Sequence, residues 1–188
     1  MMVRNLPAIM ILALTACKPP ATDDMAARGA KPERVAPSAP IDSPDTENAV
    51  WADSRQPGRI LYGNPGEPPL IALSCNREGA TAEFQITRFV EADAEASALM
   101  AMIGNGHMAR MPVEAEWNDR VWLWQGRYAA DNPDLDVLSG PRQVELTIPG
   151  AGSVILNPSQ RPGQLLDQCR RQRDPVPEID PLIDLQPE

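Results

Sequence analysis

The sequence has few of the residues on which most catalytic and metal sites depend. It contains one histidine, His107, and three cysteines in 188 residues. A Ser-His-Asp triad, a Cys-His pair or a common zinc site would have to use His107, and there is no Cys-x-x-Cys motif to complete a zinc set. His107 directly follows an Asn-Gly turn, where a polar side chain is simply tolerated. We therefore expect an exposed histidine, no catalytic residue, no metal and no cofactor.

Positive charge and long apolar runs are also scarce. Lys and Arg number 17 against 26 Asp and Glu, for a net charge of −9, and the basic residues form no stripe. We therefore expect no binding to nucleic acid. The longest apolar run, from Leu6 to Ala16, is too short to span a bilayer as a helix.

Residues 1–16 have the features of a signal peptide. Arg4 supplies a short positive region, acidic residues are absent, and the apolar run ends in Leu14-Thr15-Ala16-Cys17. This tetrapeptide resembles the lipobox of bacterial lipoproteins. The resemblance implies cleavage before Cys17 and lipidation of its thiol. The attached acyl chains would then hold the protein in a membrane at about 0.8 kcal/mol per buried methylene.

The same resemblance implies a location in the cell envelope, facing the periplasm. In the enterobacterial sorting rule an aspartate after the lipidated cysteine retains a lipoprotein in the inner membrane. Lys18 stands at that position here, which favours the outer membrane.

Both flanks of the sequence are rich in proline. Seven prolines lie between residues 19 and 57 and four between 175 and 188, so we predict a flexible tether over 17–57 and a disordered acidic tail over 172–188. Each flank has an alternative that stays open. In the tether, Val50 and Trp51 could dock onto the domain. In the tail, the aliphatic residues could form a short docking motif: Val176, Ile179, Leu182, Ile183 and Leu185.

Residues 58–171 have mostly the periodicity of short strands. The strongest signal is Asn105-Gly106 between two apolar segments, which is typical of a tight hairpin. Strands are predicted at 59–62, 70–75, 81–90, 99–104, 107–113, 120–128, 143–148 and 153–156, and a helix at 159–171. This pattern predicts a mainly β domain, a small antiparallel barrel or sandwich with one C-terminal helix.

The two remaining cysteines, Cys75 and Cys169, form an even pair. Outside the cytoplasm such a pair favours a disulfide. It would connect an early strand to the C-terminal helix and stabilise the domain by about 4–5 kcal/mol, because the closed loop is long.

Aromatic residues give the main candidate for a binding surface. Trp122 and Trp124 share one face of a strand whose other face is also apolar. One interpretation places them in the core of a central strand. The other makes them an exposed platform for a protein or glycan partner, together with Trp117 and Tyr128. Four methionines beside the hairpin are expected to fill the core: Met100, Met102, Met108 and Met111.

Glu114 and Glu116 are separated like the paired carboxylates of glycosidases, but acids near a turn are usually just solvated. We interpret them in that way, which leaves an envelope hydrolase as the least favoured function.

Two resemblances concern the domain itself. The Leu73-Ser74-Cys75 strand and the closing Leu165–Arg170 segment resemble small proteobacterial lipoprotein domains that carry no known activity. Leu123–Arg127 is similar to the Trp-x-Lys-Gly element of membrane-bound lysozyme inhibitors, but the lysine and the Ser-Gly-x-Arg-Tyr segment of that family are missing. The expected function is a non-catalytic envelope binding or assembly module, with lysozyme inhibition as an alternative.

Overall fold

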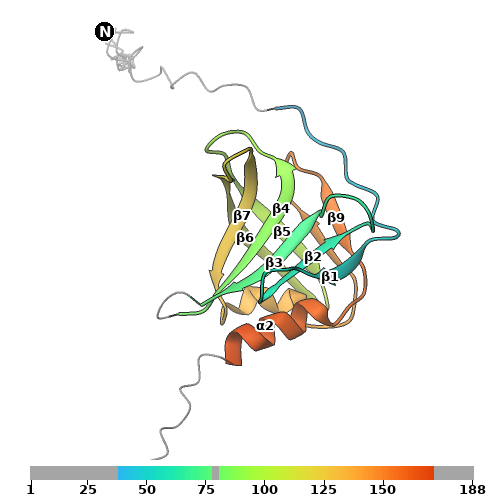
Figure 1. Cartoon of the computed structure of the whole chain (residues 1–188), viewed down its shortest axis with the longest axis vertical. Coiled ribbons are helices and arrows are strands. Elements are labelled where there is room, and N and C mark those ends of the chain that lie inside the picture. Colours follow the sequence, from blue (N-terminus) through green and yellow to red (C-terminus); the bar gives the residue numbers. More distant parts are fainter. Residues whose placement is uncertain (1–37, 78–80, 172–188) are drawn as a thin grey trace, which may run out of the picture. The chain divides into compact units, whose positions relative to one another are not determined.

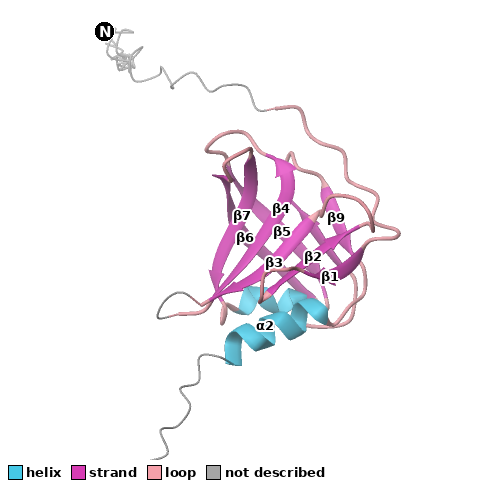
Figure 2. Ribbon diagram, viewed as in Figure 1, coloured by secondary structure: helices cyan, strands magenta, loops and turns pink. Residues whose placement is uncertain are grey.

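The computed structural model describes residues 38–77 and 81–171. The leader, Cys17, the first part of the predicted tether and the acidic tail lie outside these residues. The described part is one antiparallel sheet of nine strands, curled into a half-barrel (Figure 1). A short 3-10 helix, η1 (Pro133–Leu138), and the helix α2 (Arg161–Arg171) lie together at one end of the sheet (Figure 2). The predicted mainly β domain with a C-terminal helix is confirmed.

The order of the strands in the sheet follows their order in the sequence, except that β5 and β7 exchange places in the middle. Their spatial order is β1-β2-β3-β4-β7-β6-β5-β8-β9, so the β5–β6 hairpin folds back beside β7. The strands are β1 (Val50–Asp53), β2 (Arg59–Gly63), β3 (Ile71–Asn76), β4 (Glu83–Glu91), β5 (Ser97–Gly104), β6 (His107–Trp117), β7 (Trp122–Ala129), β8 (Val144–Thr147) and β9 (Ser153–Leu156).

The predicted tether is too long, because the folded domain includes residues from at least Ser38 onward. Trp51 in β1 is 8% exposed, and its ring lies 4.9 Å from that of Tyr62. Nearer the N-terminus, the backbone N–H of Ile41 donates to the Gly150 carbonyl at 2.9 Å. Single contacts of this kind hold a proline-rich segment in place without any periodicity that the sequence reveals. The alternative in which Val50 and Trp51 dock onto the domain is confirmed.

The core fills the concave side of the sheet and is closed by η1 and α2. Leu135, Val137 and Leu138 of η1 and Leu166 of α2 are at most 1% exposed. α2 begins where expected, since the Ser159 hydroxyl accepts the Arg161 N–H at 3.2 Å.

Cys75 and Cys169 are joined in a disulfide with their Cα atoms 5.6 Å apart. This pairing confirms the sequence prediction. The bond connects the end of β3 to α2, so it fixes the helix against the end of the sheet.

Side chains cover the open seam between the two edge strands. The Tyr62 hydroxyl donates to the Ile155 carbonyl at 2.7 Å and accepts the Asn157 N–H at 2.9 Å. The Asn157 side-chain amide donates to the carbonyls of Thr46 and Ala49 at 2.7 and 2.9 Å. These bonds satisfy backbone groups that would otherwise form an exposed sheet edge, which is the feature through which sheets aggregate.

Candidate functional site

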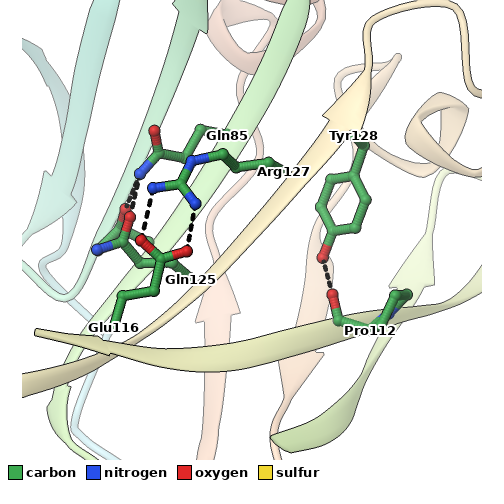
Figure 3. Close-up of polar contacts among 7 residues, drawn as sticks. Gln85, Pro112, Glu116, Gln125, Arg127 and Tyr128 are labelled. Atoms are coloured by element: carbon green, nitrogen blue, oxygen red, sulfur yellow. Dashed lines mark hydrogen bonds and ion pairs between the residues drawn. The ribbon is translucent and has the colours of Figure 1, made fainter. Parts of the chain in front are cut away.

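The sheet opens into a fork between β6 and β7. The two strands share a short ladder, from Glu114 opposite Gln125 to Trp117 opposite Trp122. Beyond Glu114, β6 continues to pair with β5 and β7 with β4. Pro112 stands where the next β6–β7 hydrogen bonds would form, and proline has no N–H to donate. The Tyr128 hydroxyl donates to the Pro112 carbonyl at 2.7 Å instead, spanning the fork (Figure 3).

Gly126 is required for this arrangement. A Cβ atom at this position would lie 1.8 Å from the Tyr128 hydroxyl oxygen, so the ring packs directly over the glycine. Burial raises the pKa of Tyr128 far above its ordinary value, because the ionised phenolate would lose its hydration.

A polar cluster lies on the outer surface above the fork. Arg127 forms a two-pronged ion pair with Glu116, and Gln85 on β4 donates to Gln125 on β7 (Figure 3). The hydrogen bonds that Arg127 donates to the Glu116 carboxylate raise the pKa of Arg127. A pocket of about 200 Å³ opens here, lined by Pro112, Glu114, Glu116, Gln125, Gly126 and Arg127. Because Glu116 is paired with a cation, this pair of glutamates lacks the arrangement of a general acid beside a free nucleophile.

An apolar stripe lies beside the cluster, on the outer face of β5 and β6. We define the β5–β6 stripe as Leu99, Ile103 and Met108, which are 57%, 50% and 63% exposed. Ile103 lies opposite Met108 in the β5–β6 ladder, and Leu99 lies opposite Pro112. Pro112 therefore connects the stripe to the fork, and the two features form one continuous surface.

The predicted aromatic platform does not form as one exposed surface. Trp124 and Tyr128 are 8% and 7% exposed and belong to the core, and Trp122 is half-buried against it. Trp117 is exposed, with its ring 5.8 Å from that of Trp122. These side chains project toward the concave side of the curled sheet, so the core interpretation is correct for Trp124 and partly for Trp122, and the platform interpretation is wrong for Tyr128.

The methionine prediction is right for three residues and wrong for one. Met100, Met102 and Met111 are at most 1% exposed, whereas Met108 points outward. The sequence signal for this exposed surface is that β5 carries apolar residues on both faces, since Leu99 and Ile103 alternate with Met100 and Met102. His107 is exposed beside the turn, as expected.

Among the described residues, one charged side chain lies in the core. Arg88 on β4 is 3% exposed and donates to the carbonyls of Leu70 at 3.2 Å and Ala151 at 3.5 Å, while its Nε atom has no hydrogen-bond partner within residues 38–77 and 81–171. The same burial lowers the pKa of Arg88. Its cross-strand neighbour Trp124 lines a pocket of about 320 Å³ at the end of the half-barrel, but Arg88 itself does not line that pocket.

Comparison with protein-family models, curated proteins and solved structures finds no match. Within residues 38–77 and 81–171, no group of three or more His, Cys, Asp or Glu side chains is placed to hold a metal ion. No helix in the same residues has the length and apolar character needed to cross a membrane. The case for a function therefore rests on the surface geometry and on the sequence.

Proposed function

We propose that this chain is an envelope lipoprotein, held to the membrane by acyl chains on Cys17, whose β domain is a non-catalytic binding module. The observation that carries the binding role is the β5–β6 stripe. Leu99, Ile103 and Met108 are each at least half exposed on the same face of two paired strands, and exposed apolar side chains that share a face are typical of interaction sites. We propose that the stripe is the centre of a contact with a protein partner in the envelope.

The surroundings of the stripe support a protein as the partner. Protein interfaces commonly combine apolar contacts with polar groups at the rim, and here the Glu116–Arg127 pair borders the stripe while Arg110 lies within it. Glycan sites instead rely on exposed aromatic platforms, and among the described residues Trp117 is the one tryptophan that is more than half exposed.

The size of the stripe favours a moderate affinity. Full burial of an aliphatic side chain contributes about 1.5–3 kcal/mol, and each of these three is already near half burial. Covering the stripe therefore contributes about 3 kcal/mol, so further contacts over the fork and its rim would be needed for tight binding.

The anchoring part is tested by membrane fractionation of a Cys17→Ser variant. We expect this variant to leave the membrane fraction while the domain keeps its fold, and the parent chain to incorporate labelled palmitate. Retention of the variant in the membrane fraction after removal of its leader would show that Cys17 is not the anchor.

The binding part is tested on complexes extracted from membranes with a mild detergent. We expect the parent protein to migrate well above the mass of one processed chain, which is below the 20.5 kDa of the full sequence, and Met108→Asp to migrate near the mass of one processed chain. Val50→Asp is the matched control, since Val50 is a similarly exposed apolar residue, 52% exposed, on β1. Equal behaviour of the two variants would remove the stripe from the interface.

A further inference from the structure

The β5–β6 stripe is an exposed apolar surface, and the same chain has an apolar segment outside the described residues that could cover it, the tail at 172–188. This segment carries five aliphatic residues, interleaved with acids. We propose that the tail docks in cis on the β5–β6 stripe and shields it until a partner displaces it. The shielding role rests on the proposed function, whereas the docking itself does not.

The point where the tail leaves the domain supports this contact. The tail follows Arg171 at the end of α2. Arg170 is held there by the Ala130 carbonyl at 2.8 Å, just after β7, and by Asp136 of η1 at 2.8 Å. η1 packs against both α2 and β6. The tail therefore starts near the open end of the fork, next to the half of β6 that carries Met108.

The length of the tail is sufficient. An extended chain covers about 3.3 Å per residue, so residues 172–188 reach on the order of 50 Å. The stripe spans only the segment of β6 between Met108 and Pro112 and the facing part of β5. The aliphatic residues begin at Val176, so a few residues remain as a connection between α2 and the stripe.

The apolar content of the tail matches the stripe, and Arg110 is the cation that its acids would contact, between Glu114 and Glu145 on the same face. The tail has five acids and one arginine, whereas Arg110 projects from the middle of the stripe, opposite Ala101, and is exposed. Glu145 borders the other side of the stripe, opposite Ile103, so an acidic segment is favoured on the Arg110 side. Proline favours extended backbone, so the prolines at 175, 177 and 181 suit a segment that docks along a strand.

Because the tail is covalently joined to α2, weak contacts are sufficient for it to occupy the stripe. A flexible connection of this length holds the tail at an effective concentration of roughly 1 mM near the stripe. A free tail peptide with a dissociation constant near that value would, when tethered, occupy the stripe about half of the time. Removing the tail would then raise the affinity for a partner about twofold, and more if the tail binds more tightly.

The experiment compares NMR spectra of the secreted chain carrying Cys17→Ser with those of the same chain ending at Arg171. We expect chemical-shift changes at Leu99, Ile103 and Met108 that do not depend on protein concentration, while Val50 stays unchanged. A synthetic peptide of residues 172–188, added to the shortened chain, should reverse these changes with a dissociation constant near or below 1 mM.

A second variant covers the case in which the shortened chain does not fold. The full-length chain with Ile179→Ser, Leu182→Ser and Leu185→Ser keeps its length and charge, and it should reproduce the shift changes at the stripe. The proposal is overturned if the stripe is unaffected in both variants, or if shift changes stay confined to α2 and η1. Changes that grow with protein concentration would identify a second copy as the occupant and equally refute docking in cis. None of these outcomes involves a partner, so failure of the tail contact is distinguishable from failure of the proposed function.

Discussion

The seam between the edge strands depends on one asparagine, and this dependence can be measured. Asn157→Ala removes both hydrogen bonds from the side-chain amide to the carbonyls of Thr46 and Ala49, while its backbone N–H still reaches Tyr62. Each lost bond costs about 1 kcal/mol, and the two carbonyls are left without that donor in a half-buried position. We therefore expect a loss of about 2 kcal/mol in the free energy of unfolding.

The assay is urea denaturation of the secreted chain carrying Cys17→Ser. With a slope of about 1–3 kcal/mol per molar urea, the midpoint should fall by roughly 1 M, with the slope unchanged. Asn64→Ala is a matched control, because the Asn64 amide also donates twice, to the Asp45 carbonyl and to Glu67, but at the exposed surface.

Water replaces the partners of an exposed amide, so the control should lose about 0.5 kcal/mol or less. If Asn157→Ala costs no more than Asn64→Ala, side chains do not stabilise the seam, and the half-barrel must be held by its core and disulfide alone.

Three further predictions concern the core. Replacing Cys75 and Cys169 by Ala should destabilise the domain by about 4–5 kcal/mol, since the bond spans 94 residues; a midpoint shift in urea worth under 1 kcal/mol would contradict this. Burial raises the pKa of Tyr62 and of Tyr128, so both phenols stay protonated in the fold, and stability should be intact below pH 10 and fall above it by up to about 1.4 kcal/mol per pH unit for each tyrosine. Unfolding in urea at pH 9 and 11 measures this fall, which Tyr128→Phe should reduce and which an unchanged pH dependence would refute. Arg88→Met should stabilise the domain by about 1 kcal/mol or more, because it removes a desolvated charge that has only carbonyl partners among the described residues; a lower melting temperature would point to an anionic partner for Arg88.

Much of the fold could be predicted because local signals agreed with it. The Asn105-Gly106 turn fixes the β5–β6 hairpin, and the Asn105 side chain adds long-range bonds to the Val137 carbonyl and the Arg142 N–H. β9 lies at the predicted residues, since the glycines around Ala151 end the preceding strand and allow the turn. In such elements the information is contained within a few neighbouring residues.

The elements that were missed depend on distant partners. β1 lies in a proline-rich segment and forms because Trp51 finds Tyr62 and because β2 offers a free edge. η1 was not among the predicted elements, and it is ordered by the burial of Leu135 and Leu138 at the open fork.

The candidate surface was hidden for a related reason. β5 and β6 carry apolar residues on both faces, and periodicity alone does not tell which face a sheet buries. Which methionine points outward is decided by the curl of the sheet and by the β5–β6 register, so Met108 became distinguishable from Met111 only in three dimensions. Likewise, Trp124 and Tyr128 were assigned to the core by the concave side on which they lie.

The most direct test of the binding role is site-specific photocrosslinking in intact cells. A photoreactive amino acid is placed at Met108 and, as the control, at Val50, and the adducts are compared by mass. The account predicts a discrete adduct with a different protein from position 108, at several times the yield from position 50. Equal yields at the two positions, or an adduct of twice the mass of the chain, would contradict it.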